Sequence, residues 1–192
     1  MNKVLFLGPE NERIIRYLAK IGHSVKVIQR VITEEDIKEY DYYISFGYTH
    51  IIPYSIIKLV KMQIINIHIS YLPWNRGTSP NLWSILSDTP KGISIHQIDE
   101  GIDTGPIYVQ KEIIFEENDT LRTSYNKLIT LAEDVFIENW ENIRDGKICA
   151  ISQKGKGSYQ STQDTDKYQY LLIYGLDTPI SLIKQMVMRE QC

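Results

Sequence analysis

The chain has 192 residues, of which 43% are apolar and 23% are charged. This length and composition fit one well-buried globular domain and exclude a disordered chain, a collagen and a disulfide scaffold. The net charge of −3 gives no general attraction for nucleic acid, and two cysteines cannot form a framework. No apolar run approaches the roughly 20 residues of a membrane span, and the opening apolar stretch is too short for a signal peptide. We therefore expect a cytoplasmic enzyme or binding domain.

The first part of the chain predicts strands that alternate with a helix. Apolar runs indicate strands over Lys3–Leu7, Val25–Ile28 and Tyr42–Phe46. Between the first two, Asn11–Ile21 places its isoleucines and a leucine on one helical face, and Gly22 ends the helix. Such alternation implies right-handed crossovers and a mainly parallel sheet.

The rest of the chain continues this pattern around a long, turn-rich loop at Tyr71–Pro80. We predict strands over Gln63–Ser70, Gly92–Ile98 and Ile107–Phe115, and helices over Asn81–Leu86 and Thr120–Ile143. The tail from Lys154 is rich in Gly, Ser, Gln and Asp, which predicts a hairpin or loop before a short terminal helix. The fold class is therefore α/β and Rossmann-like, with a mostly parallel central sheet flanked by helices. We expect a catalytic or binding domain over residues 1–150 and a short appendage over residues 151–192, packed on the same domain.

Two polar side chains mark the end of the fourth predicted strand. Asn66 and His68 are two residues apart, so both leave the same face of the strand, while Ile65 and Ile67 point to the opposite face. The carboxyl ends of parallel strands are where open α/β sheets place their ligands. The pattern alone leaves a structural alternative, in which His68 satisfies a loop carbonyl and Asn66 caps a turn.

A turn crowded with acids and glycines, Asp99–Pro106, follows the next predicted strand. Such a turn can return a carboxylate over the sheet edge, although Asp and Gly are also common in solvated loops. An amide, an imidazole and a carboxylate together suit transfer of a one-carbon acyl group to an amine. The amide can donate to an oxyanion, the imidazole can exchange a proton and the carboxylate can orient the imidazole. The same set could serve a hydrolase.

The segment Asn66–Gly77 resembles the Asn-x-His-x-Ser-x-Leu-Pro-x-x-x-Gly signature of the folate-dependent formyltransferases, and Asp103-Thr104-Gly105 matches the Asp-Thr-Gly turn of that family. Three ordered motifs at the expected spacing, including the loop Gly47–Pro53, are more specific than any one of them. The resemblance implies that Asn66, His68 and Asp103 are catalytic and that the formyl donor is 10-formyltetrahydrofolate. The segment before Tyr42 is short, so one strand-helix unit usual in the family is reduced or missing.

The resemblance also implies which residues contact the donor. On the folate side they are Phe46, Gly47, Ile52, Pro53, Asp99 and Gly101. His23, His50 and His96 show no metal-ligand spacing, so we interpret them as structural or surface residues and expect no metal.

The family formylates initiator methionyl-tRNA, glycinamide ribonucleotide and amino groups of nucleotide-linked sugars. The short tail argues against the separate barrel domain of the tRNA enzyme. In the purine enzyme a Gly- and Ser-rich turn holds a phosphate, whereas this chain has Gly8–Glu12, in which Pro9 lacks a donor and two glutamates would repel the phosphate. The purine enzyme and a folate-binding protein without turnover remain alternatives.

The aromatic-rich loop resembles that of the nucleotide-sugar N-formyltransferases. Trp74 can form an apolar wall for a deoxysugar, and Arg76 can contact a diphosphate. Tyr159 could line the sugar site or be an exposed hairpin tyrosine. The predicted substrate contacts are Ser70, Trp74, Asn75, Arg76, Gly77 and Tyr159. The resemblance implies an amine on a nucleotide-linked deoxyamino sugar, best matched by dTDP-4-amino-4,6-dideoxyglucose, with a product used in surface polysaccharide synthesis. It also implies a homodimer.

Overall fold

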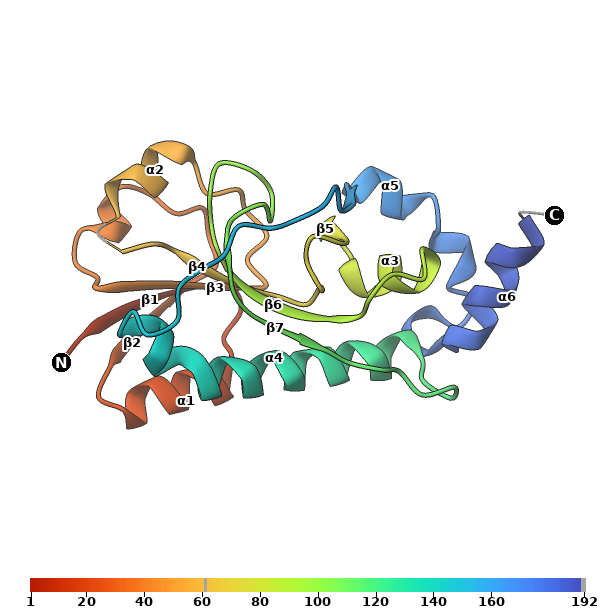
Figure 1. Cartoon of the computed structure of the whole chain (residues 1–192), viewed down its shortest axis with the longest axis horizontal. Helices are drawn as coiled ribbons and strands as arrows, with labels where there is room; N and C mark the ends of the chain where they lie inside the picture. The colour runs from red at the N-terminus through yellow and green to blue at the C-terminus, as the bar shows by residue number, and fades with distance from the viewer. Residues whose placement is uncertain (61, 191–192) are drawn as a thin grey trace. The chain divides into compact units, whose positions relative to one another are not determined.

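The structure is a computed structural model that describes residues 1–60 and 62–190 (Figure 1). Its elements in chain order are β1 (Lys3–Leu7), α1 (Glu12–Lys20), β2 (Ser24–Ile28), the 3₁₀ turn η1 (Glu35–Ile37), β3 (Tyr42–Phe46), α2 (Tyr54–Leu59), β4 (Ile65–His68), β5 (Arg76–Gly77), α3 (Pro80–Leu86), β6 (Gly92–Gln97), β7 (Ile107–Glu112), α4 (Leu121–Arg144), β8 (Tyr159–Gln160), α5 (Thr162–Asp166), the 3₁₀ turns η2 (Gln169–Leu171) and η3 (Gly175–Asp177), and α6 (Ile180–Glu190). Each strand and helix predicted from residue 3 to residue 143 is present, with bounds that differ by a few residues.

In the described part of the chain, six strands form one sheet in the order β2-β1-β3-β4-β6-β7. The first four are parallel, and Phe46 of β3 lies in register with Ile67 of β4. β6 and β7 are joined by the acid-rich turn, where the Gln97 N–H donates to the Pro106 oxygen. Residue numbers rise along one of these strands as they fall along the other, so the pair is antiparallel. The sheet is therefore mostly parallel, as predicted.

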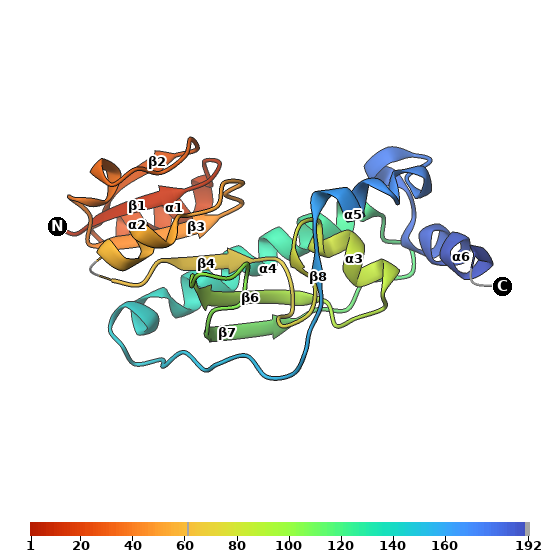
Figure 2. The ribbon, with the colours of Figure 1, turned by 90° about the horizontal axis from the view of Figure 1, so that it is seen from above.

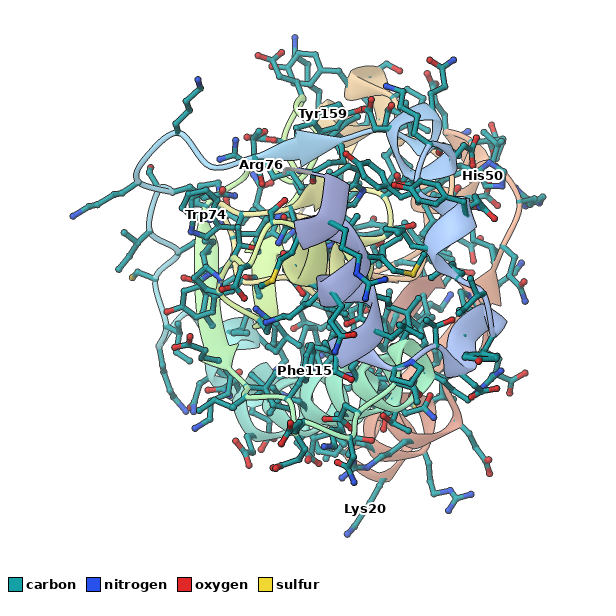
Figure 3. The ribbon with its side chains drawn as sticks, turned by 90° about the vertical axis from the view of Figure 1, so that its right-hand side faces the viewer. Lys20, His50, Trp74, Arg76, Phe115 and Tyr159 are labelled. Atoms are coloured by element: carbon teal, nitrogen blue, oxygen red, sulfur yellow. The ribbon has the colours of Figure 1, made fainter. Side chains whose placement is uncertain are left out.

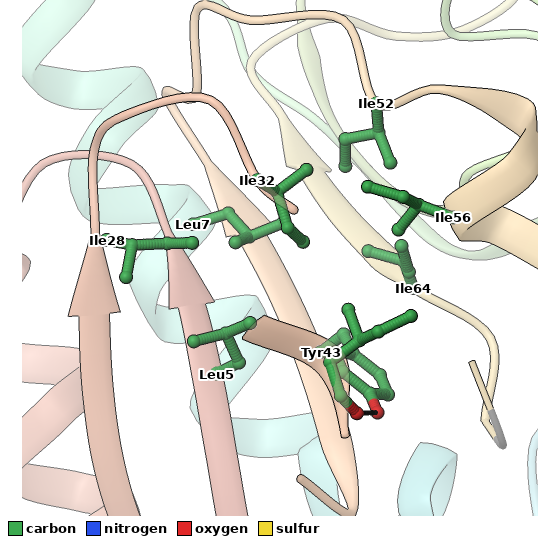
Figure 4. Packing of buried hydrophobic residues seen from close by; sticks show 9 residues of the cluster. Leu5, Leu7, Ile28, Ile32, Tyr43, Ile52, Ile56 and Ile64 are labelled. Carbon is green, nitrogen blue, oxygen red and sulfur yellow. Dashed lines mark hydrogen bonds between the residues drawn. The ribbon is translucent and has the colours of Figure 1, made fainter. Parts of the chain in front are cut away.

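Apolar side chains cover both faces of the parallel strands. On one face, α2 packs on β1, β3 and the chain before β4, in a cluster that includes Leu7, Tyr43 and Ile56 (Figure 4). On the other face lie α1 and residues 133–144 of α4, where Tyr17 meets Phe136 edge to face (Figure 1). Four consecutive residues of β1, Val4–Leu7, are fully buried, and their side chains point alternately to the two faces. Packing on both faces holds the carboxyl ends of the strands in fixed positions.

The connection from β2 to β3 is shorter than a strand-helix unit, as the sequence predicts, and contains only η1. Two tyrosines fix it: the Tyr43 hydroxyl donates to the Ile37 oxygen at 2.8 Å, and the Tyr48 hydroxyl accepts from the Ile32 N–H at 2.9 Å. Arg30 pairs with Asp36 in the same segment and holds the pKa of that carboxyl well below its usual range. Side-chain contacts thus replace the missing crossover helix.

Contacts divide the chain into two compact units that interleave in the sequence. The first contains Met1–His68, Ile95–Val109 and Glu133–Gln153, and the second contains Ile69–Ser94, Gln110–Ala132 and Lys154 onward. These units cut across the division that we expected at residue 150. Residues of β6, β7 and α4 belong to both units. Figure 2 shows these three elements from above. In the tail, β8 pairs in parallel with β5 rather than with a following strand, which corrects the predicted hairpin.

An aromatic cluster lies at the amino ends of the strands in the first unit. His23 is only 6% exposed and meets Tyr42 and Trp140 edge to face, with ring centroids 5.7 Å and 6.1 Å away. Neither ring nitrogen of His23 has a hydrogen-bond partner among the described residues. Burial lowers the pKa of His23 from its ordinary 6.5, and Arg144 lowers this pKa further. His23 is thus a neutral core residue, consistent with the structural role predicted for it.

Replacing His23 by Leu should make stability less dependent on pH. As pH falls below 6.5, the unfolded chain takes up a proton on this histidine before the folded chain does, so the folded state loses stability. Urea unfolding at about pH 7.5 and about pH 5.5 measures this loss. We expect the parent to lose more of its free energy of unfolding between these pH values than the His23→Leu protein. Equal losses in the two proteins would show that His23 is not the titrating group.

Candidate active site

Asn66 and His68 lie on one face of β4, as the two-residue period predicts. Ile65 and Ile67 are 4% and 2% exposed on the opposite face and anchor the strand in the core. His68 ends the strand and is 9% exposed, and Asn66 is half-buried. Phe46 of β3 pairs with Ile67 of β4. The next residue along each strand is Gly47, where the predicted folate loop begins, and His68, so these two residues lie side by side. The folate loop and the polar pair therefore share one edge of the sheet.

The turn between β6 and β7 presents Asp103 in a left-handed conformation, with φ of 53°. Asp99 shapes this turn, because its carboxylate accepts from the Gly101 N–H at 3.1 Å and from the Thr104 hydroxyl at 2.6 Å. A Cβ on Gly101 would lie 2.1 Å from that hydroxyl oxygen, so only glycine fits there. From outside the turn, the Gln153 amide donates to the carbonyl oxygens of Asp103 and Gly105 at 2.8 and 2.9 Å. The backbone of Asp103 is thus fixed from two sides.

The Asp103 carboxylate lies among three side chains from the neighbouring strands. Its Oδ2 is 3.6 Å from His68 Nε2, and its Oδ1 is 3.3 Å from Asn66 Nδ2. The same Oδ1 is 3.5 Å from Nε2 of His96 on β6. The Asp103 and His68 side chains are 13% and 11% exposed, which strengthens their electrostatic interaction relative to open water. The structure brings the three predicted catalytic residues together, and their catalytic role stays a prediction.

His96 belongs to this group, although its sequence context indicated only a structural or surface residue. It is 1% exposed, its Nε2 lies 3.2 Å from Asn66 Nδ2, and its ring meets the His68 ring edge to face at 6.2 Å. The sequence indicates a strand at this position but not that β6 follows β4 in the sheet. A prediction of that strand order would have placed His96 beside Asn66.

The residues predicted for the folate side lie in the first unit. Phe46 and Ile52 are buried at 7% and 8%, so they shape the loop from beneath, while residues 49–51 between them are exposed. Pro53 begins α2, and Asp99 with Gly101 forms the turn that carries Asp103. An exposed loop beside His68 offers backbone groups to a flat heterocycle, which fits the predicted donor.

The residues predicted for the sugar side all lie in the second unit. Figure 3 labels Trp74, Arg76 and Tyr159. Trp74 lies in the loop before β5, Arg76 is the first residue of β5, and Tyr159 is the first residue of β8. Trp74 is 38% exposed and Tyr159 is 53% exposed, so both rings are open to a ligand. Gly77 follows Arg76 in β5, and a Cβ there would lie 2.3 Å from the Gln160 oxygen.

Two of the residues predicted to contact the substrate make internal hydrogen bonds that support the loop. Asn75 is fully buried and donates from Nδ2 to the Thr89 hydroxyl at 2.7 Å, and its backbone N–H donates to the Ser158 hydroxyl at 2.8 Å. Ser70 is 3% exposed and donates to the Trp74 carbonyl at 2.6 Å. These bonds set the path of the chain on both sides of Trp74. Sequence patterns do not distinguish a ligand contact from such internal support.

Within the part of the chain that the structure describes, no group of three His, Cys, Asp or Glu side chains is arranged to hold a metal ion. Over the same residues, no helix combines the length and apolarity needed to cross a membrane.

Comparison with known proteins identifies the family. Residues 12–139 match the family described as formyl transferase. A dTDP-4-amino-4,6-dideoxyglucose formyltransferase of Mycobacterium bovis is 31% identical over 81% of this chain and 67% of its own length. A methionyl-tRNA formyltransferase of Thermodesulfovibrio yellowstonii is 35% identical, over 62% of this chain and 39% of that protein. The chain therefore belongs to the formyl transferase family.

A solved structure with nearly half of its sequence identical also matches most of this chain. It is the formyltransferase PseJ from Anoxybacillus kamchatkensis in complex with UDP-4,6-dideoxy-4-formamido-L-AltNAc and tetrahydrofolate. The two chains are 46% identical, the match covers 94% of this chain and 97% of PseJ, and the TM-score is 0.91. The fold of this chain and that of PseJ are thus alike over nearly their full lengths.

The close approach of Gly157 to the loop before β5 gives a test of how that loop is held. Gly157 has φ of 63°, and a Cβ there would lie 2.1 Å from the Pro73 oxygen. Gly155 is also left-handed, with φ of 85°, but no atom of the described residues lies within 4 Å of its Cβ position. Gly155→Ala should cost about 1 kcal/mol of unfolding free energy from backbone strain alone. Gly157→Ala should cost about 1–3 kcal/mol more, because the Pro73 carbonyl must move.

Urea unfolding of the two alanine variants beside the parent measures both costs. Indistinguishable losses would mean that Gly157 does not support the loop.

Proposed function

We propose that this chain transfers a formyl group from 10-formyltetrahydrofolate to the 4-amino group of a UDP-linked 4-amino-4,6-dideoxyhexose. The single observation that carries the proposal is the Asn66–His68–Asp103 group, held in a chain 46% identical to PseJ over almost its full length. The PseJ complex contains a UDP-linked 4-formamido sugar, which is the product of such a reaction. This match favours uridine over the thymidine nucleotide suggested by the sequence.

The reaction requires one nitrogen to replace another at the formyl carbon. The donor supplies that carbon, and its N10 keeps the electron pair of the broken bond and gains a proton. The sugar amine forms the new C–N bond and loses a proton, so protons and electrons balance. The protein therefore has to hold negative charge on the formyl oxygen and move one proton between two nitrogens.

The site has groups for both tasks. Asn66 Nδ2 can donate to the formyl oxygen as negative charge develops there. His68 Nε2 faces Asp103 Oδ2 at 3.6 Å, so the carboxylate stabilises the imidazole when it carries the transferred proton. His68 can then exchange that proton with the amine or with N10, directly or through a water.

The sugar nucleotide is expected on the second unit. Trp74 and Tyr159 offer exposed rings for the deoxysugar or the base, and the Arg76 guanidinium can bind the diphosphate. The internal bonds of Asn75 and Ser70 fix the chain that carries Trp74 and Arg76. Each of these residues therefore either contacts the sugar nucleotide or supports the loop that does so.

The structure also provides an argument against the purine-pathway alternative. At the start of α1, Asn11 caps the helix and donates to Glu133 at 2.8 Å, and Glu12 occupies the first turn. Glu12 pairs with Arg16 and Glu133 pairs with Arg13, and the Asn11 side chain already accepts from the Ile14 N–H, so this helix end offers neither excess positive charge nor all its N–H groups to a phosphate. We also propose a cytoplasmic homodimer that binds neither nucleic acid nor membranes, with a product that enters surface polysaccharide synthesis.

The decisive experiment measures tetrahydrofolate release with 10-formyltetrahydrofolate and a panel of amines. The panel contains UDP- and dTDP-linked 4-amino-4,6-dideoxyhexoses and glycinamide ribonucleotide. We expect turnover with the UDP-linked sugar to exceed that with the dTDP-linked sugar, and none with the ribonucleotide. Preference for glycinamide ribonucleotide would support the purine enzyme, and folate binding without release in any mixture would indicate a binding protein.

His68→Ala should lower turnover by about 100- to 10,000-fold, because it removes the proton-transfer group. His23→Leu provides the matched histidine control, since His23 lies in the aromatic cluster at the opposite ends of the strands. Circular dichroism and folate-analogue binding test whether each variant is folded. A folded His68→Ala enzyme within about threefold of the parent would remove His68 from the mechanism.

A further inference from the structure

The hydrogen bonds of His96 define its protonation state. His96 Nδ1 lies 2.7 Å from the carbonyl oxygen of Gln97, which can only accept a hydrogen bond. Nδ1 therefore carries a hydrogen. If the ring is neutral, Nε2 has a free lone pair directed at Asn66 Nδ2, 3.2 Å away.

The surroundings of Asn66 agree with a neutral His96. An amide nitrogen can only donate, and Asn66 Nδ2 has two hydrogens for two acceptors, His96 Nε2 and Asp103 Oδ1. His96 Nε2 also lies 3.5 Å from Asp103 Oδ1, but a hydrogen on Nε2 would place two donors against each other at the shorter distance of 3.2 Å. Turning the amide to relieve this would bring Asn66 Oδ1 to the position 3.3 Å from a carboxylate oxygen. The observed orientation is the one that satisfies all three groups.

We propose that His96 is a positioning residue that fixes the orientation of the Asn66 amide. Its unprotonated Nε2 holds one amide hydrogen, and the second hydrogen, which is on Asp103 Oδ1 in this structure, is then the one that turns to the formyl oxygen when the donor binds. The part of this inference that concerns catalysis rests on the proposed function, whereas the protonation state of His96 and its bond to Asn66 do not.

The Asn66 amide has two tasks, because it bonds to side chains of the protein and also has to donate to the formyl oxygen. Without an acceptor behind it, the Asn66 amide would be held only by its bond to Asp103 Oδ1, and the carboxylate would compete with the formyl oxygen for the hydrogen that fixes the amide. His96 is 1% exposed, so water cannot readily replace its nitrogen as the acceptor. Loss of this acceptor should therefore lower the rate of the chemical step more than the binding of either substrate.

The first test reads the protonation state directly, in the full chain without substrates. ¹⁵N NMR of protein with labelled histidine distinguishes a protonated from an unprotonated ring nitrogen, and the spectrum of the His96→Gln protein assigns the signals. We expect His96 to be protonated on Nδ1 and unprotonated on Nε2 at neutral pH. A hydrogen on Nε2 would overturn the inference whether or not the enzyme turns over.

The second test is a double-mutant cycle with Asn66, measured as kcat and KM for both substrates. His96→Leu should lower kcat by about tenfold to a hundredfold, a part of the roughly 100- to 1,000-fold that loss of an oxyanion donor costs. Both KM values should stay within about threefold of the parent. In the Asn66→Ala background the same change should cost less than about twofold, because no amide remains to be oriented.

His96→Gln is the conservative variant, since its side-chain oxygen can accept the Asn66 hydrogen, and it should keep more activity than His96→Leu. Equal losses from His96→Leu with and without Asn66 would show that His96 acts by another route and would overturn the inference. A parent enzyme that formylates none of the amino sugars would instead contradict the proposed function, and the NMR result would still decide the protonation state.

Discussion

A nearly buried carboxylate, that of Asp103, is the group around which the site is arranged. A charge with 13% exposure is costly to bury unless polar groups compensate for it. Asn66 and His68 face its two oxygens at 3.3 and 3.6 Å, and both come from β4, an inner strand of the sheet. The same carboxylate can therefore be kept ionised and be used to stabilise a proton on His68.

The sheet fixes the side chains that face this carboxylate, and the turn fixes the carboxylate itself. The parallel strands, packed by α2 on one face and by α1 on the other, fix Asn66 and His68 at a carboxyl edge. The turn that carries Asp103 is held by Asp99 within it and by Gln153 from residues beyond α4. A left-handed aspartate costs backbone energy, and these bonds offset that cost.

The predicted functions also divide between the two units. The catalytic and folate-side residues lie in the first unit, and the residues predicted for the sugar nucleotide lie in the second. The boundary falls directly after His68, because Ile69 begins the second unit. One continuous segment thus carries both the proton-transfer group and the loop with Trp74 and Arg76, which is why a single sequence motif indicates both activity and substrate class.

The sequence was sufficient where local periodicity or a motif determines the structure. The two-residue period placed Asn66 and His68 on one face of a strand, and the crowded turn indicated a carboxylate returning to the sheet edge. His96 and Gln153 were not recognised, because their roles depend on strand order and on a contact 50 residues away in the chain. Asn75 is fully buried and bonded to Thr89 and Ser158, which a motif does not show, and its contact with substrate stays a prediction.

The charge of Asp103 can be removed with little change of shape. The Asp103→Asn variant therefore tests most directly whether this carboxylate takes part in the reaction. Asn has nearly the same size as Asp and also tolerates the left-handed backbone, so Asp103→Asn tests charge rather than geometry. The single-turnover rate of formyl transfer, measured with both substrates saturating, should fall by about 100- to 10,000-fold while folate affinity is retained. A parental rate in the Asp103→Asn protein would contradict the account, because the turn would then be only a scaffold and the carboxylate would not take part in the reaction.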